Sequence, residues 1–318
     1  MNNVSGKNLK RIGRVRQTGI CLGKLFRMFV FQSDWKVIPM AAVITEIVAF
    51  VVAGSMNKTM EGTVKGAFAL SCICIWNGFF NSIQVVCRER AIVKREHRSG
   101  LHMSAYIAAH MIYQAFLCAC QCIIIIQVLN FSKVKFPESG LIFSSNRVDI
   151  FLTLFLVTFA ADMIALFVSC LVKNPTTAMT IVPFMLIIQL VFAGTFFNLK
   201  GAAAQLSEFT ISKWGIRAVC SEANYNELPM SSVWTTIKKM RNVEYEGSKP
   251  VQFVVDQVEA EDDGVEQFTQ KCGEQNPSTE YLSTSENVAD CWGTLVGIAL
   301  LFAGLSVISL EFIDKDKR

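Results

Sequence analysis

The sequence predicts an all-α membrane protein with six transmembrane helices. Hydrophobic residues make up 52% of the 318 residues. Charged residues make up only 18%, whereas soluble proteins average roughly 25%. Six continuous apolar runs each approach the ~20 residues that a helix needs to cross a bilayer. Because these runs do not alternate polar with apolar residues, they exclude a transmembrane β-barrel, and the composition argues against a soluble enzyme.

A basic segment, residues 1–36, precedes the first apolar run. Its single acid is Asp34, and its basic residues are Lys7, Lys10, Arg11, Arg14, Arg16, Lys24, Arg27 and Lys36. Apolar residues recur at helical spacing near its end, at Leu22, Leu25, Phe26, Phe29 and Val30. This pattern predicts an amphipathic helix in the membrane interface, with Trp35 as an aromatic anchor. An ordinary juxtamembrane stretch is the alternative.

The apolar runs set the expected spans and divide the chain. The spans cover residues 37–55, 66–87, 105–129, 150–172, 178–197 and 292–312. Residues 37–197 therefore hold the first five spans, with a loop over residues 88–104 between the second and the third. Residues 198–290 form a long polar segment, and residues 291–318 hold the sixth span and a short tail.

The placement of lysine and arginine predicts the orientation. The loop after the second span contains Arg88, Arg90, Lys94, Arg95 and Arg98. Positive residues collect on the cytoplasmic side, so this loop and both termini are expected in the cytoplasm of a multi-pass plasma-membrane protein. Residues 198–290 then lie outside. They include an acidic run over residues 259–263, and the apolar residues 251–255 are expected to form a strand in a small external cap.

Motifs of soluble enzymes are absent from the sequence. It contains no GxxxxGK[ST] phosphate loop, no HExxH and no nucleophile elbow. We expect no metal site, since His97 and His102 are more typical of a solvated loop and most cysteines fall within the spans. Cys272 and Cys291 would lie outside, where they could form a disulfide or remain thiols.

Two acids fall within apolar runs, Glu46 in the first span and Asp162 in the fourth. A charge exposed to lipid is costly, so both are expected to face protein or water. Proton coupling is one interpretation. The other is a buried hydrogen bond to an amide side chain, for which the candidates are Asn77, Asn81, Gln84 and Gln114.

The loop after the second span carries both signs of charge at helical spacing. Glu89 and Glu96 lie seven residues apart, on one face, within reach of ion pairs with Arg90, Lys94 or Arg95. A Ser99-Gly100 break precedes the third span. This pattern predicts a short helix that projects into the cytoplasm as a docking element; a simple positive-inside loop is the alternative.

Three local patterns together resemble a known family. The first is Glu89, Arg95-Glu96 and Ser99-Gly100, followed by Ser104-Ala105-Tyr106. The second is FAGTFFNL at residues 192–199, and the third is ISKWGIRA at residues 211–218. In this order, within six spans, they resemble the membrane domain of ABC exporters of the G subfamily, which has the type-2 exporter fold. The resemblance covers nearly the whole chain.

The resemblance implies roles for particular residues. Residues 22–34 match the connecting helix, and residues 211–218 match a re-entry segment. The coupling element that contacts an ATPase would comprise Glu89, Arg90, Arg95, Glu96, His97, Arg98, Ser99 and Gly100. The translocation path would be lined by Asn77, Gly78 and Asn81 of the second span, facing Ile187 and Val191 of the fifth. Thr195 and Phe196 take the position of the family's paired-leucine gate, a departure that makes one residue polar and the other aromatic.

The resemblance also implies partners. Such a chain is a permease that pairs with a second copy or a paralogue and contacts membrane lipid; nucleic acid is not expected. It would bind no cofactor and would not itself be an enzyme, because ATP and Mg²⁺ bind to the partner ATPase. Residues 1–36 are too few for a nucleotide-binding domain, so that domain is expected on another chain. The expected cargo is amphiphilic or hydrophobic.

Two other functions remain as alternatives. An ion-coupled secondary transporter would use Glu46 and Asp162, but it predicts an internal symmetry that the sequence lacks. A membrane sensor would bind its ligand through the external segment and would need a cytoplasmic signalling domain.

Overall fold

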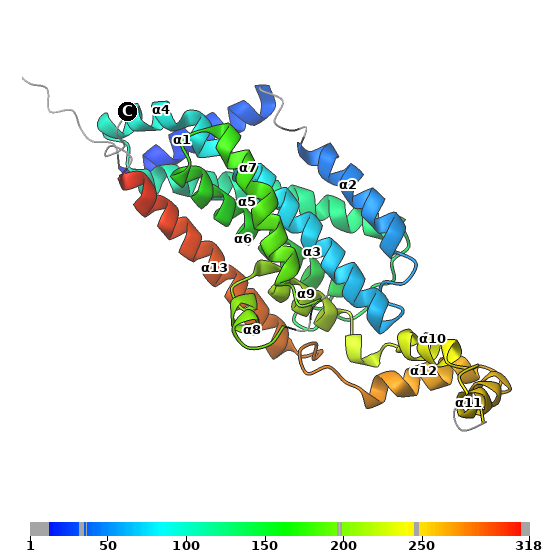
Figure 1. Ribbon diagram of the computed structural model, residues 1–318. Coiled ribbons are helices and arrows are strands. Elements are labelled where there is room, and N and C mark those ends of the chain that lie inside the picture. Colours follow the sequence, from blue (N-terminus) through cyan, green and yellow to red (C-terminus); the bar gives the residue numbers. More distant parts are fainter. Residues whose placement is uncertain are drawn as a thin grey trace, which may run out of the picture.

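The computed structural model describes residues 13–31, 35, 37–195, 197, 199–244 and 248–312, and the regular structure of these residues is entirely helical. Figure 1 shows an elongated bundle with α1 (Arg14–Phe31) and α4 (Val85–Arg98) at one end. At the opposite end lie α10 (Ser231–Lys239), α11 (Pro250–Glu259) and α12 (Gly264–Gln275). We call these the basic end and the cap end.

Each predicted span overlaps one apolar helix. These helices are α2 (Val37–Val52), α3 (Met60–Ser82), α5 (Met103–Phe131), α6 (Asn146–Leu171), α7 (Pro175–Val191) and α13 (Ser285–Glu311). Within the residues that the structure describes, four segments are long and apolar enough to cross a membrane, namely Met60–Arg98 and the helices α5, α6 and α13. α2 and α7 are shorter apolar helices. The all-helical membrane class is confirmed, and the count of six spans stays a prediction.

α6 is the central helix of the bundle. It contacts α3, α5, α13 and also α9 (Ile211–Glu222). Its small residues allow close packing, since Ala160, Ala161 and Ala165 are fully buried. Apolar side chains such as Leu154 and Val157 fill the space between the helices. The core therefore runs along the length of α6.

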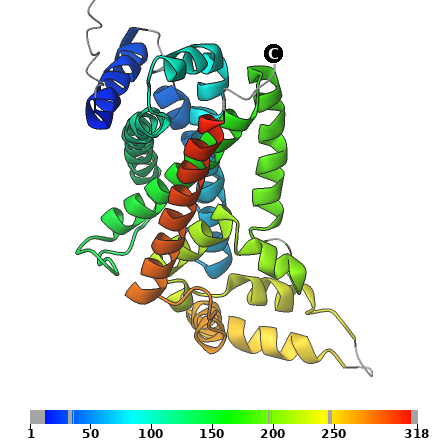
Figure 2. The same ribbon diagram turned by 90° about the vertical axis from the view of Figure 1, so that its left-hand side faces the viewer.

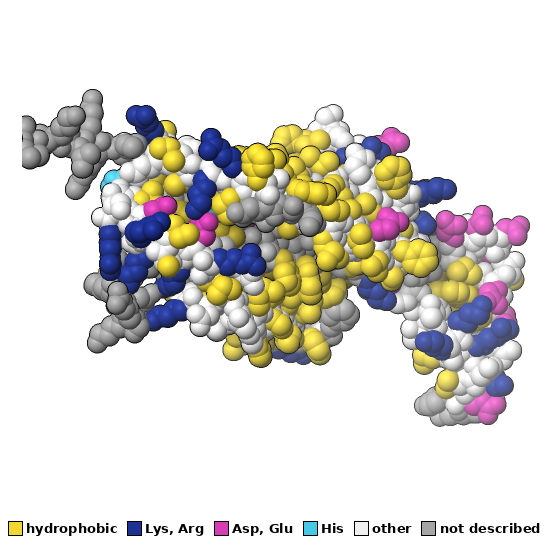
Figure 3. Space-filling model, turned by 90° about the horizontal axis from the view of Figure 1, so that it is seen from above, with side chains coloured by type: hydrophobic (Ala, Val, Ile, Leu, Met, Phe, Trp, Pro, Cys, Tyr) yellow, Lys and Arg dark blue, Asp and Glu magenta, His cyan; other side chains and the backbone are white. Residues whose placement is uncertain are grey.

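Side-chain chemistry divides the bundle into zones. Lys and Arg gather at the basic end, hydrophobic side chains cover the middle, and both signs of charge appear at the cap end (Figure 3). An apolar belt between charged ends is typical of a protein that crosses a bilayer, because side chains facing lipid must be apolar.

The predicted amphipathic helix is present as α1. Its apolar face packs on α5, where Leu25 joins Ala109, Tyr113 and Leu117 in a small cluster. Phe26 adds an edge-to-face contact with Tyr113, at 5.7 Å between ring centroids. A position in the membrane interface remains a prediction, and Asp34 and Lys36 lie outside the described residues.

The cap consists of helices, so the expected strand over residues 251–255 is wrong. These residues belong to α11, where Pro250 occupies the first helical turn and Val255 is buried while Phe253 is exposed. Pro favours the first helical position because its fixed backbone angle suits it and no N–H is lost. The valines at 251, 255 and 258 have helical spacing, and this periodicity outweighed the β propensity of valine.

Cys272 and Cys291, considered above as a possible disulfide, are both free thiols in this structure. Cys272 lies on α12 in the cap, and Cys291 is fully buried in α13. The disulfide between them stays one of the two alternatives of the sequence analysis.

Candidate functional site

The basic end is built around the α4–α5 turn. Ser99 and Gly100 end α4, and Gly100 adopts a φ of +103°, which a residue with a side chain rarely tolerates. The amide of Leu101 donates to the Glu96 carbonyl at 3.0 Å, and the Ser99 hydroxyl donates to the Arg95 carbonyl at 3.0 Å. These bonds give α4 a fixed end.

α1 is fastened to this turn by polar contacts. Gln17 donates through Nε2 to the Gly100 carbonyl at 3.2 Å and accepts at Oε1 from the amide of His102 at 2.9 Å. Lys24 Nζ lies 2.9 Å from Glu89 Oε2. Glu89 thus pairs with α1, whereas the sequence analysis placed its ion pair within the loop. The contacts join α1, α4 and the start of α5 into one unit.

α4 is also anchored to the end of α6. The Ser169 hydroxyl accepts from the amides of Val86 and Cys87, at 3.0 and 3.2 Å. Arg90 donates to the carbonyl of Cys170 at 2.7 Å and to that of Val172 at 3.3 Å. Carbonyls at a helix end lack intrahelical partners, so Arg90 satisfies the last turn of α6. These bonds therefore tie α4 to the bundle.

The opposite face of α4 is exposed. Its exposed residues repeat at helical spacing: Arg88, Ala91, Ile92, Arg95, Arg98 and Ser99. The predicted coupling residues therefore divide into two groups. Arg95, Arg98, Ser99 and Gly100 are exposed, while Glu89 and Arg90 hold α4 in place; Glu96 and His97 are half-buried.

One amide predicted for the path, Asn81, belongs to a hydrogen-bond network inside the chain. Asn81 and Gln121 exchange two hydrogen bonds, at 3.0 and 3.1 Å. Gln114 donates through Nε2 to the Asn81 carbonyl at 3.3 Å and to the Ser82 hydroxyl at 2.8 Å. These bonds join α3 to α5, a pairing that the sequence analysis did not foresee. Asn77 is also buried on α3, but its Nδ2 has no hydrogen-bond partner among the described residues.

Gly78 was expected to face α7, and this expectation is wrong for the single chain. A Cβ on Gly78 would lie 2.3 Å from the Thr158 carbonyl oxygen and 2.8 Å from the Ala161 side chain. Both neighbours belong to α6. The missing side chain therefore lets two helices approach closely.

The apolar candidates on α7 are exposed. Ile187 is 54% exposed and Val191 is 38% exposed, and α7 runs along the outside of the bundle (Figure 2). On α3, the exposed residues near Asn77 are Trp76 and Phe80, whose rings stack at 4.9 Å. Sequence reasoning missed this pair, although its spacing of four predicts one shared helical face.

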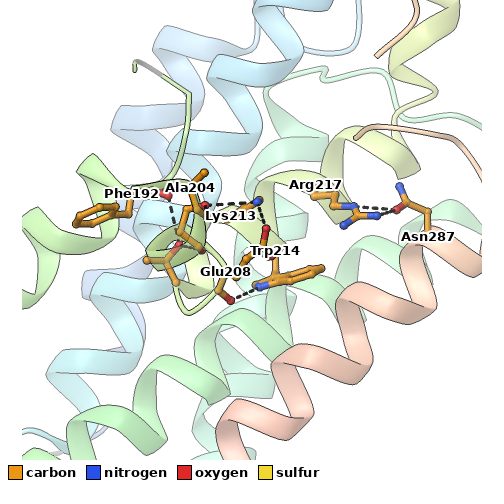
Figure 4. Close-up of polar contacts among 9 residues, drawn as sticks. Phe192, Ala204, Glu208, Lys213, Trp214, Arg217 and Asn287 are labelled. Atoms are coloured by element: carbon orange, nitrogen blue, oxygen red, sulfur yellow. Dashed lines mark hydrogen bonds and ion pairs between the residues drawn. The ribbon is translucent and has the colours of Figure 1, made fainter. Parts of the chain in front are cut away.

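The gate and the re-entry segment lie toward the cap end. Thr195 is half-buried, and Phe196 lies outside the described residues. Nearby, Trp214 Nε1 of α9 donates to the carbonyl of Glu208, which follows α8 (Ala202–Ser207), at 2.8 Å (Figure 4). The hydroxyl of Thr210, which precedes α9, donates to the carbonyl of Phe192, which follows α7, at 3.4 Å. The re-entry residues thus form a braced helix.

α9 connects two apolar helices. The Ser212 hydroxyl donates to the Gln189 carbonyl of α7 at 2.6 Å. On the next turns, Arg217 Nε donates to Asn287 Oδ1 of α13 at 2.8 Å, while its guanidinium lies 5.3 Å from the Trp214 ring centre (Figure 4). α9 is a strap between α7 and α13.

Comparison with known proteins identifies the family. The family model of the ABC-2 type transporter matches residues 16–221, which run from α1 to α9 and make up more than half of the chain. The chain belongs to the ABC-2 type transporter family. The resemblance seen in the sequence is therefore confirmed at the level of an ABC-type permease.

One relative of the permease is an ABC transporter ATP-binding/permease protein of Mycobacterium tuberculosis. It is 24% identical over 168 residues, which are 50% of this chain and 19% of that protein. The matched region therefore spans about a fifth of the relative.

The two acids within apolar helices have different surroundings in the permease. Asp162 is fully buried and accepts from the Cys118 thiol at 3.6 Å. Glu46 is exposed on α2, among the exposed side chains of Val43, Ile47 and Phe50. Asp162 therefore faces protein, as expected. Of the two interpretations, proton coupling stays untested, and the 3.6 Å bond comes from a thiol and not from an amide.

Sequence reasoning missed a buried acid near the cap end of the permease. Glu222 ends α9 and accepts from the Thr153 hydroxyl of α6 at 2.5 Å. The Thr153 oxygen in turn accepts from Trp292 Nε1 of α13 at 2.7 Å. Because Glu222 stands in a polar stretch of sequence, hydropathy carried no signal of its burial.

Proposed function

We propose that this permease is the membrane subunit of an ATP-driven exporter for an amphiphilic or hydrophobic substrate. ATP and Mg²⁺ would bind to a nucleotide-binding domain outside this sequence. The basic end would face the cytoplasm, in keeping with the positive-inside rule, and the protein would lie in the plasma membrane with both termini inside.

The observation that carries the proposal is the construction of α4. One face is bonded to α1 through Lys24–Glu89 and to α6 through Ser169 and Arg90. The other face exposes Ile92 and Arg95. A helix held rigidly on one side and exposed on the other is suited to dock on a motor domain and to transmit its movement.

The translocation path would form where two permease chains meet. α7 exposes Phe184, Ile187 and Val191, and α3 exposes the stacked Trp76 and Phe80. We propose that these apolar faces, together with Asn77 and Asn81, surround the substrate. Thr195 and Phe196 would form the gate above them. ATP binding would draw the partner domains together, and the paired α3 and α7 helices would alternate between inward and outward access.

The experiment tests the Lys24–Glu89 pair in the complex that the permease forms in its native membrane. We expect Lys24→Glu and Glu89→Lys each to lower substrate-stimulated ATP hydrolysis by about tenfold, within the usual range of coupling energies. The double charge swap should recover at least half of the loss. Arg27→Gln, on the exposed side of α1, is the matched control.

Membrane insertion of every variant is checked by extraction and size-exclusion chromatography. Purification of the permease without any nucleotide-binding protein would overturn the proposed function. Normal stimulation in both single variants would remove the assigned role of the pair.

A further inference from the structure

A cavity of about 450 Å³ lies at the basic end, between α1, α2, α3, α4 and α5. This volume falls within the range of small-molecule sites, roughly 300–1,000 Å³. Its lining residues come from these five helices and from Gln84, which follows α3. The cavity borders the proposed path, because Phe80 and Asn81 of α3 belong to both, while its other lining residues lie on α1, α2, α4 and α5 or at Gln84.

Two buried polar atoms on one wall have no hydrogen-bond partner. They are Gln114 Oε1 and His110 Nδ1, on residues that are 0% and 1% exposed. The orientation of the Gln114 amide is fixed, because its Nε2 donates to the Asn81 carbonyl and to the Ser82 hydroxyl. Its oxygen is left to accept a bond. Both residues line the cavity, and their spacing of four places them side by side on α5.

The rest of the lining is largely apolar. Leu25 and Met28 contribute from α1, Phe80 from α3 and Leu117 from α5. At one side Arg88 is exposed, and Glu89 is paired with Lys24. His110 and Gln114 lie seven and eleven residues from the start of α5, which corresponds to depths of about 10 and 16 Å along the helix.

An unpaired buried acceptor is costly, and a ligand hydroxyl would satisfy it. A formally charged head group would find no opposite charge at the orphan atoms, so the chemistry favours an uncharged one. The adjacent hydroxyls of a glycerol head group can bond Gln114 Oε1 and His110 Nδ1 together. The apolar walls suit one alkyl chain.

We propose that this cavity binds a single-chain amphiphile with an uncharged, hydroxylated head group, held by Gln114 and His110. The site shares Phe80 and Asn81 with the proposed path, but Gln114 and His110, which would hold the head group, lie on α5, and binding there does not depend on the proposed transport function. Because α1 and α4 both line the cavity, the bound amphiphile stiffens the unit that they form.

The test is photolabelling of the full chain in lipid nanodiscs. The probe is a 1-monoacylglycerol with a diazirine and an alkyne on its acyl chain, and labelled peptides are identified by mass spectrometry. We expect label on α5 around residues 110–117 and on the facing parts of α1 and α3. Gln114→Leu should reduce this label about tenfold, as expected for one lost buried hydrogen bond.

Gln127→Leu is the matched control, because it makes the same change at an exposed position of α5. Excess monooleoylglycerol should compete with the probe, and methyl oleate, which lacks a hydroxyl donor, should not. Met28 is half-buried on α1, and Met28→Trp would place a larger side chain in the cavity. This variant should also reduce the label, so the test stays informative even if Gln114→Leu does not fold. No label at these residues, equal label in Gln114→Leu and Gln127→Leu, or equal competition by methyl oleate would overturn the proposal.

Discussion

A single glycine sets the distance between α3 and α6. At Gly78 a Cβ would lie 2.3 Å from a backbone oxygen, and backbone cannot move aside as a flexible side chain can. The adjoining residues Asn77 and Phe79 are buried as well. Gly78 therefore determines how closely the central helix packs, and through it the position of the Asn81–Gln121 pair.

We expect Gly78→Val to destabilise the permease by about 1–3 kcal/mol, the usual cost of overpacking a core. Unfolding in detergent, followed by far-ultraviolet circular dichroism, measures the change. Gly293→Ala on α13 is the control, because a Cβ at that position would meet open space, with nothing within 4 Å. Equal stability of Gly78→Val and the wild type would contradict the packing described for α3 and α6.

Residue pairing is the part of the site that the sequence could not predict. Glu89 lies next to Arg90 and close to Lys94, yet it pairs with Lys24, 65 residues earlier. Asn81 and Gln121 are 40 residues apart. Periodicity identifies the face of one helix but carries no information about the neighbouring helix, so such partners emerge only from the packed bundle.

At the scale of elements, α4 depends on contacts from outside itself. Its first amides, those of Val86 and Cys87, donate to the Ser169 hydroxyl of α6. The first amides of a helix have no intrahelical acceptor, so Ser169 acts as an external cap. The start of α4 is therefore stabilised by a side chain of α6.

We expect Ser169→Ala to speed amide hydrogen exchange in the peptide that spans residues 85–90 by about fivefold, as for a lost hydrogen bond worth about 1 kcal/mol. Exchange is measured by mass spectrometry on the reconstituted chain. Thr180→Ala is the control, since that exposed hydroxyl donates only to its own helix, at the Thr176 carbonyl. Equal exchange in Ser169→Ala and the wild type would show that Ser169 does not secure α4.

Elements with a long apolar or amphipathic pattern were predictable, and those in the polar segment were not. All six apolar helices and α1 overlap their predicted ranges because burial in lipid leaves an extended hydropathy signal. The three cap helices, each of 12 residues or fewer, leave only a short signal. A short pattern does not distinguish a helix from a strand. Residues 251–255 are an example, because their five apolar and polar residues fit a strand as well as a helical turn.

At the scale of the whole molecule, the two ends are built differently. The basic end is continuous with the bundle through α1 and α4, whereas the cap is held together partly by surface ion pairs. Lys238 Nζ lies 3.0 Å from Glu259 Oε1, and Arg241 lies 2.6 Å from Asp256. These pairs join α11 to α10 and to the residues that follow α10.

We expect acid to loosen the cap before the bundle. The hydrogen bond from Lys238, and then the charges of Lys238 and Arg241, hold the pKa of Glu259 below its ordinary value of 4.5. A lowered pKa contributes stability above the unfolded value, and that stability is lost as the pH falls below about 4.5 through the folded value. Fluorescence of Trp234 on α10, isolated by subtracting Trp234→Phe, reports the change.

In this titration Glu259→Gln should remove part of the pH dependence, and Glu261→Gln is the neighbouring control. Far-ultraviolet circular dichroism of the bundle should stay constant over the same range. Simultaneous loss of both signals would mean that the cap and the bundle unfold as one unit.

The strap formed by α9 has a consequence for biosynthesis. Its bond to Asn287 comes from the last apolar helix, about 70 residues later in the chain. The ribosome therefore delivers α7 and α9 to the membrane well before their final brace exists. Until α13 has been synthesised, Arg217 of the nascent permease lacks its Asn287 partner. The surface of α9 that α13 later covers is then accessible to chaperones and membrane proteases.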